Sequence, residues 1–142
     1  MKNTYFQISE SDKKIIMEKL RYSLEKRPNL LLAYVYGSFV MADKFRDIDI
    51  AVYLKQIPST PLHVELELET ELGNIIKNYL VDVRILNNAP LSFRYNVIKS
   101  GKPIVVVDDD ARTDFEEATL SNYFDFSPFR KMYLKETLGH GI

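Results

Sequence analysis

Three aspartates interrupt apolar stretches of the sequence. Asp47 and Asp49 lie in the segment RDIDIAV, and Asp82 lies in the segment LVDVRI. An ionised carboxylate beside a hydrophobic strand is unfavourable unless it is paired, hydrogen-bonded or bound to a metal ion. Mg²⁺ prefers oxygen ligands and is typically held by a few carboxylates together with substrate phosphates. The three aspartates are therefore candidate ligands of one or two Mg²⁺ ions in a phosphoryl-transfer site.

A Gly-Ser pair precedes the first two aspartates. Gly37 and Ser38 follow the apolar run 30–36, and eight residues separate Ser38 from Asp47. Glycine lets backbone N–H groups approach a phosphate, and serine adds a hydroxyl donor. Taken alone, Gly-Ser fits an ordinary turn, and Asp-x-Asp fits a strand that faces solvent. The combined order of apolar strand, Gly-Ser, Asp-x-Asp and a later strand aspartate is more specific, and it indicates a phosphate-binding site.

The elements that position these residues follow from apolar periodicity and from glycine and proline positions. Helices are expected over residues 9–26, 63–79 and 91–100 and in a C-terminal helical tail of about 110–139, which Pro128 should break or kink near residue 126. Strands are expected over residues 30–36, 48–54, 80–86 and 103–107. Asp47 and Asp49 are two residues apart, so on an extended chain they point to the same side.

This order predicts an α/β (α+β) fold with a mixed four-stranded sheet flanked by helices, in a single domain over residues 1–142. Ile15 is assigned to the apolar positions of the first helix. In and just after the helix 63–79, the candidate core residues are Leu66, Leu68, Leu72, Ile75, Ile76 and Leu80.

Composition excludes several classes of function. The 142 residues carry a net charge of −1 and no cysteine, so disulfides, thiolate zinc sites and cysteine nucleophiles are excluded. A near-neutral chain is not expected to bind nucleic acid directly. No apolar run approaches the roughly 20 residues that a membrane helix needs. A protein of the cytoplasm, without membrane contact, is the expectation.

The motif residues Gly37, Ser38, Asp47, Asp49 and Asp82 resemble those of the DNA polymerase β-like nucleotidyltransferase superfamily, and within it the minimal nucleotidyltransferase (MNT) antitoxins. The likeness continues through VDVRIL, APLSFR and the segment 101–107, and extends to YFDF in the tail. The resemblance implies the nucleotidyltransferase fold and a metal-dependent transferase that uses ATP as substrate and Mg²⁺ as cofactor.

The resemblance also implies a role for each motif residue. Asp47 and Asp49 would hold the metal ion that binds the triphosphate, and Asp82 would join them and help to activate the acceptor hydroxyl. Gly37 and Ser38 would hold the nucleotide phosphates. MNT antitoxins are encoded beside HEPN-family toxins. The implied partner is therefore a HEPN toxin, with which the chain could form an oligomer. The implied reaction is transfer of AMP to a toxin tyrosine.

Two departures from the family pattern keep alternatives open. The eight-residue spacer is shorter than is typical, and Val40-Met41-Ala42 replaces the usual Ala-Arg-Gly. A non-catalytic antitoxin that neutralises its toxin by binding remains one alternative, and a nucleotidyltransferase acting on a small molecule is another. Arg46, Arg84 and Arg94 either contact phosphates or form surface ion pairs.

Overall fold

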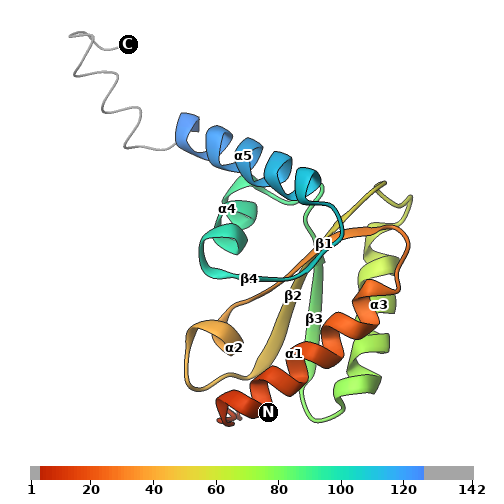
Figure 1. Cartoon of the computed structure of the whole chain (residues 1–142), viewed down its shortest axis with the longest axis vertical. Helices are drawn as coiled ribbons and strands as arrows, with labels where there is room; N and C mark the ends of the chain where they lie inside the picture. Colours follow the sequence, from red (N-terminus) through yellow and green to blue (C-terminus); the bar gives the residue numbers. More distant parts are fainter. Residues whose placement is uncertain (1–3, 127–142) are drawn as a thin grey trace, which may run out of the picture.

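Residues 4–126 are described by a computed structural model (Figure 1). The order of elements alternates helices with strands, and a short helix lies between the first two strands. The helices are α1 (Glu10–Glu25), α2 (Ser38–Met41), α3 (Pro61–Ile76), α4 (Leu91–Ser100) and α5 (Asp109–Phe126). The strands are β1 (Leu30–Tyr36), β2 (Asp47–Leu54), β3 (Leu80–Ile85) and β4 (Lys102–Val106).

The four strands form one mixed sheet in the order β3-β2-β1-β4. β1 is antiparallel to both β2 and β4, whereas β2 and β3 are parallel. The parallel pair needs a crossover connection, and α3 supplies it. This topology places β2 in the interior of the sheet and β3 at one edge, so the two aspartate-bearing strands are direct neighbours.

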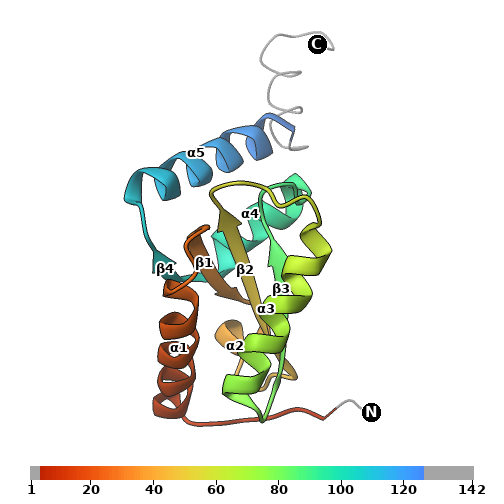
Figure 2. The same cartoon turned by 90° about the vertical axis from the view of Figure 1, so that its right-hand side faces the viewer.

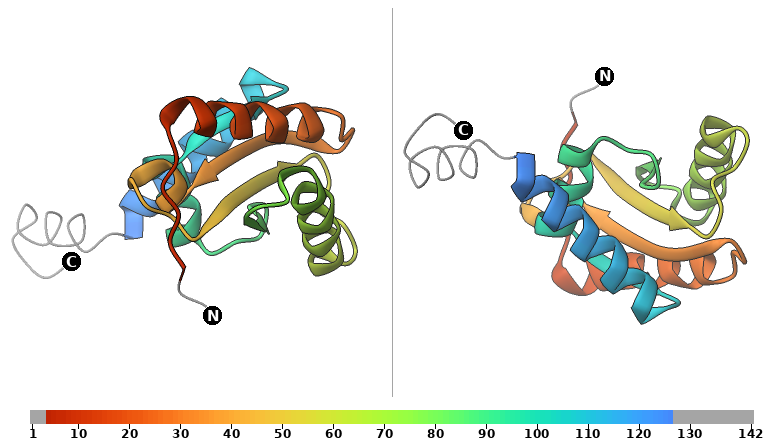
Figure 3. Two further views of the ribbon diagram at one scale, coloured as in Figure 1. Left: turned by 90° about the horizontal axis from the view of Figure 1, so that it is seen from below. Right: turned by 90° about the horizontal axis from the view of Figure 1, so that it is seen from above.

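Helices cover both faces of the sheet (Figures 2 and 3). α1 and α3 pack together on one face, and α4 and α5 pack together on the other. Strand residues alternate between two apolar clusters. Ile48, Ile50 and Val52 belong to the cluster under α1 and α3, whereas Tyr36 and Ala51 belong to the cluster under α4 and α5.

Local signals place the helix ends. Ser9 caps α1, since its Oγ accepts the N–H of Asp12 at 3.1 Å. Asp108 caps the start of α5 by accepting the N–H of Asp110 at 2.9 Å, so the acidic run at this point is a helix start. The part of the predicted tail beyond residue 126, with Pro128, lies outside the described residues.

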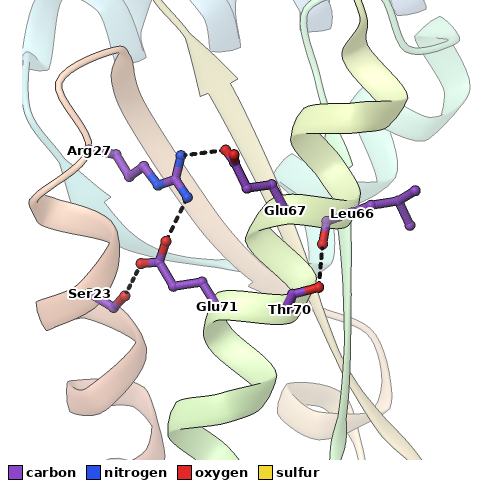
Figure 4. A network of polar contacts seen from close by, with 6 residues as sticks. All are labelled: Ser23, Arg27, Leu66, Glu67, Thr70 and Glu71. Atoms are coloured by element: carbon purple, nitrogen blue, oxygen red, sulfur yellow. Dashed lines mark hydrogen bonds and ion pairs between the residues drawn. The ribbon is translucent and has the colours of Figure 1, made fainter.

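A polar network joins α1 to α3 on their facing sides (Figure 4). Arg27 binds Glu71 at 2.6 Å and Glu67 at 3.1 Å, and Ser23 donates to Glu71 at 2.7 Å. Leu66 is drawn with its side chain directed away from this network. The network therefore fixes which side of α3 faces α1, and it leaves the Leu66 side exposed.

Four apolar residues are not where the sequence predicts them. Leu66 and Leu80 were predicted in the core with Ile75, and Ile15 on the apolar side of α1, yet all four side chains are exposed. α3 also begins at Pro61 rather than at residue 63, because proline is well suited to the first helical position. For Leu66 and Ile75 the prediction failed because α3 packs along the edge strand, so only a narrow stripe of this helix, which includes Leu68 and Leu72, reaches the core.

The helices of residues 4–126 lack the length and apolar character that crossing a membrane requires.

Candidate functional site

The three aspartates lie together on the face of the sheet that α4 and α5 cover. Asp49 pairs with Asp82 in the parallel register of β2 and β3, and Asp47 precedes Asp49 by two residues on the same face. Their strand neighbours Ile48, Ile50, Val81 and Val83 point to the opposite face and are buried there. All three carboxylates are half-buried. The fold thus brings the predicted acids into one row across two strands.

Gly37 lies against this row. It directly follows Tyr36, and Tyr36 is opposite Asp49 in the antiparallel register of β1 and β2. Its φ of 82° and ψ of −161° belong to a region that is essentially restricted to glycine. A Cβ added at this position would overlap Oδ2 of Asp49. The sequence needs glycine here for two reasons: the backbone conformation and the close approach of the carboxylate.

Ser38 begins the short helix α2 directly after Gly37. The carbonyl of Gly37 accepts the N–H groups of Val40 and Met41 at 3.1 and 3.0 Å, and that of Ser38 accepts the N–H of Ala42 at 3.0 Å. These bonds close one compact turn of helix in the eight-residue spacer. The turn keeps Gly37 and Ser38 at the end of β1, next to Asp49.

The electrostatics of the row follow from burial and from like charges. Burial raises the pKa of Asp49 to about 6, with further contributions from Asp47 and Asp82 and an opposing one from Arg84. Burial, and after it the charge of Asp49, raise the pKa of the Tyr36 hydroxyl. Nε of Arg84 lies 3.6 Å from Oδ2 of Asp82. The row is therefore a concentration of negative charge that the guanidinium of Arg84 partly balances.

This donor set fits a divalent cation. Within residues 4–126, no three acidic or histidine side chains converge on a single metal position in this conformation. Asp82 also has a competing partner, since Nε of Arg84 lies 3.6 Å from its Oδ2. Three carboxylates on adjacent strands are nevertheless oxygen ligands of the type that Mg²⁺ prefers. The residues that could hold it are Asp47, Asp49 and Asp82.

Residues 18–110 match the family described as polymerase beta, nucleotidyltransferase. The chain belongs to this nucleotidyltransferase family. The matched segment contains β1, the Gly37-Ser38 turn, and both aspartate strands.

Solved structures share the fold of this nucleotidyltransferase. An MNT antitoxin in complex with tri-AMPylated HEPN toxin from Shewanella oneidensis is 23% identical, with 89% of this chain and 98% of that chain covered and a TM-score of 0.67. The toxin-antitoxin MntA-HepT is 22% identical, with 92% and 99% covered and a TM-score of 0.61. A toxin-antitoxin with AMP-PNP is 25% identical, with 92% and 99% covered and a TM-score of 0.63. No curated protein gives a significant match.

Lys13 is a residue of this nucleotidyltransferase that the sequence analysis missed. Its side chain is buried, and its Nζ donates to the carbonyls of Phe39 at 2.9 Å and Ala42 at 3.1 Å. The ammonium also lies 5.3 Å from the ring centre of Phe39 and 5.8 Å from that of Phe45. Lys13 therefore holds α2 from its C-terminal end. The sequence did contain a signal: position 13 belongs, with 17, 20 and 24, to the helical positions of α1 that face the core, and a lysine there is unusual.

Glu69 was also missed. Its Oε2 accepts the N–H of Val83 at 2.9 Å, and one turn earlier Glu65 accepts the N–H of Ile85 at 2.9 Å. Burial raises the pKa of Glu69, and the neighbouring Asp82 raises it further. The i, i+4 spacing of two glutamates on a helix resembles an ordinary solvated face, so the sequence alone gave no usable signal for their contact with β3.

The three arginines have different surroundings in the nucleotidyltransferase site. Arg84 contacts the row through Asp82. The guanidinium of Arg46 lies 5.6 Å from the ring centre of Tyr5, which is the geometry of a cation–π interaction. Nε of Arg94 is buried without a hydrogen-bond partner among the described residues.

Proposed function

We propose that this nucleotidyltransferase is an adenylyltransferase antitoxin, which transfers AMP from ATP to a tyrosine of a HEPN-family toxin. The observation that carries the proposal is the position of Asp49. It stands in register with Asp82 on one side and in contact with the Gly37 turn on the other. The residues proposed as cation ligands, as the acceptor-side carboxylate and as the phosphate-binding turn therefore lie close together on the sheet.

Similar structures support the choice of donor and partner. One is an MNT antitoxin in complex with a tri-AMPylated HEPN toxin, and another is a toxin-antitoxin with AMP-PNP. The present chain covers 98–99% of these antitoxin chains. That coverage favours a protein acceptor over a small molecule, because the chain shares the architecture of antitoxins that bind a toxin protein.

The residues of the turn and of the row have distinct tasks in the proposed reaction. The N–H groups and hydroxyl of the Gly37-Ser38 turn hold the phosphates of ATP. Asp47 and Asp49 are the proposed Mg²⁺ ligands together with Asp82, and the ion would neutralise phosphate charge when bound. The tyrosine oxygen forms a bond to the α-phosphorus, the bond from that phosphorus to the pyrophosphate oxygen breaks, and the phenolic proton passes to a carboxylate oxygen of Asp82. Catalysis is then mainly positioning and charge neutralisation.

The test is incubation of the purified chain with its HEPN toxin, Mg²⁺ and ATP labelled on the α-phosphate. Label on a toxin tyrosine is the expected result, and Asp49→Asn should abolish it. Asp108→Asn is a matched control, since Asp108 is an acid outside the row and its amide replacement keeps an oxygen to cap α5. Tight toxin binding without label would instead establish a non-catalytic antitoxin. We place the reaction in the cytoplasm, where ATP is available.

A further inference from the structure

A cleft runs along the edge strand β3, between α3 and the start of α4. Its volume is about 750 Å³, within the range of ligand pockets. Its apolar walls come from the loop before α3, from α3 itself and from α4. They include Ile57, Pro61, Leu62, Leu66, Pro90 and Phe93.

The cleft reaches the row of aspartates through Asp82, which is one of its lining residues. The sheet order β3-β2-β1-β4 places Gly37, at the end of β1, on one side of Asp49 and places Asp82 on the other. In phosphoryl transfer the attacking and leaving oxygens are roughly in line. With the phosphates at the Gly37 turn, the acceptor oxygen must approach from the Asp82 side, where the cleft opens.

The walls of the cleft expose more apolar surface than folding requires. Leu62 is 65% exposed, Leu66 is 53% exposed and Ile57 is 48% exposed. Leu62 and Leu66 are one helical turn apart, so they form two adjacent apolar projections on α3. Figure 4 shows Leu66 pointing away from the network that joins α3 to α1. A contiguous exposed apolar patch of this kind is typical of a surface that a partner covers.

The polar lining of the cleft determines what chemistry it accepts. Glu65 and Glu69 occupy the N–H groups of Ile85 and Val83, so an occupant cannot pair with those groups as an added strand. The lining carries the carboxylates of Glu65, Glu69 and Asp82 and a single guanidinium, that of Arg84. The cleft therefore favours a segment that contacts it through apolar side chains and carries positive charge beside them.

We propose that this cleft binds the segment of the acceptor protein that bears the modified tyrosine. Apolar side chains of that segment pack on Leu62 and Leu66, a basic side chain lies near Glu65 or Glu69, and the phenol reaches Asp82. This inference rests on the proposed function, and it adds where the acceptor docks and what chemistry the docking segment has.

The test is steady-state transfer of labelled AMP to the purified HEPN toxin by Leu66→Asp and Leu66→Ala. The matched control is Ile15→Asp, because Ile15 is 54% exposed in the middle of α1, away from the cleft. Leu66→Asp should raise the KM for the toxin by about tenfold or more, with a smaller rise for Leu66→Ala. The KM for ATP and the thermal midpoint should stay at their wild-type values, and Ile15→Asp should match wild type throughout.

The outcomes separate the two proposals. Absence of transfer by the wild-type chain would overturn the proposed function and the acceptor cleft with it. Transfer by wild type with an unchanged toxin KM in Leu66→Asp would overturn the cleft assignment alone. A rise in the KM for ATP, with the toxin KM unchanged, would also overturn it, since the cleft would then hold the nucleotide. Leu62→Asp, at the more exposed position, repeats the test if Leu66→Asp lowers stability.

Discussion

Asp49 and Asp82 stand side by side in the register of two parallel strands, on one face of the sheet. Both side chains are half-buried, and each carboxylate lies beside another acid on the neighbouring strand. For Asp49 the result is a pKa of about 6, raised first by burial and then by Asp47 and Asp82. The row is thus electrostatically unfavourable by itself, as expected for residues arranged to bind a cation.

Asp49→Asn should stabilise the metal-free protein while it abolishes transfer. Between the ordinary pKa of 3.8 and the folded value of about 6, the folded state binds more protons than the unfolded state, so stability falls as pH rises. The penalty is complete above that window. Because Asp49 is only half-buried, we discount it to on the order of 1 kcal/mol. Urea unfolding in a chelator should show the variant more stable near pH 8 and equal to wild type below about pH 4. A variant that is less stable near pH 8 would contradict this account.

Gly37→Ala should lower both activity and stability. The backbone at Gly37 has a φ of 82°, and an added Cβ would overlap Oδ2 of Asp49. We expect a loss of about 1–3 kcal/mol in the free energy of unfolding and loss of most transfer activity. The matched control is Gly73→Ala in α3, where a Cβ meets nothing within 4 Å and alanine favours the helix by about 0.5–1 kcal/mol. Equal stabilities of the two variants would show that Gly37 is not constrained.

Lys13→Met should loosen α2. The substitution removes the buried ammonium group, whose Nζ donates to the carbonyls of Phe39 at 2.9 Å and Ala42 at 3.1 Å. The expected cost is about 1–3 kcal/mol. Since α2 carries the Gly37-Ser38 turn, the KM for ATP should also rise, while the toxin KM should not. Lys14→Met, at the exposed neighbouring lysine, should stay within about 0.5 kcal/mol of wild type. An unchanged KM for ATP in Lys13→Met would remove Lys13 from the support of the turn.

The sequence predicts most of the fold because its signals are local. β1 and α4 have the predicted bounds, and the Asp47–Asp49 pair lies at the start of β2 as expected. Apolar periodicity, the glycine after each of these elements and the serine cap of α1 are readable without tertiary information. The convergence of Gly37 on Asp49 was expected from the order of motifs, and the register of β1 and β2 provides it.

What the sequence does not predict depends on how elements pack. Leu66 and Leu80 are apolar residues of the kind found in cores, yet both are exposed. Leu80 begins the edge strand β3, and Leu66 lies on α3, which packs along that strand. Lys13 and Glu69 look like solvated charges in a helix, yet one caps α2 and the other binds the backbone of β3. Such contacts join residues 14 or more positions apart, so no short-range pattern records them.

The most direct measurement is titration of the chain with Mn²⁺, followed by electron paramagnetic resonance, with and without a non-hydrolysable ATP analogue. The account predicts that wild type binds Mn²⁺ more tightly when the analogue is present. Asp49→Asn should lose this binding by about tenfold or more, and Asp108→Asn should retain it. Equal Mn²⁺ binding by wild type and Asp49→Asn, or binding that the nucleotide leaves unchanged, would contradict the claim that the row of aspartates gathers a cation for a nucleotide.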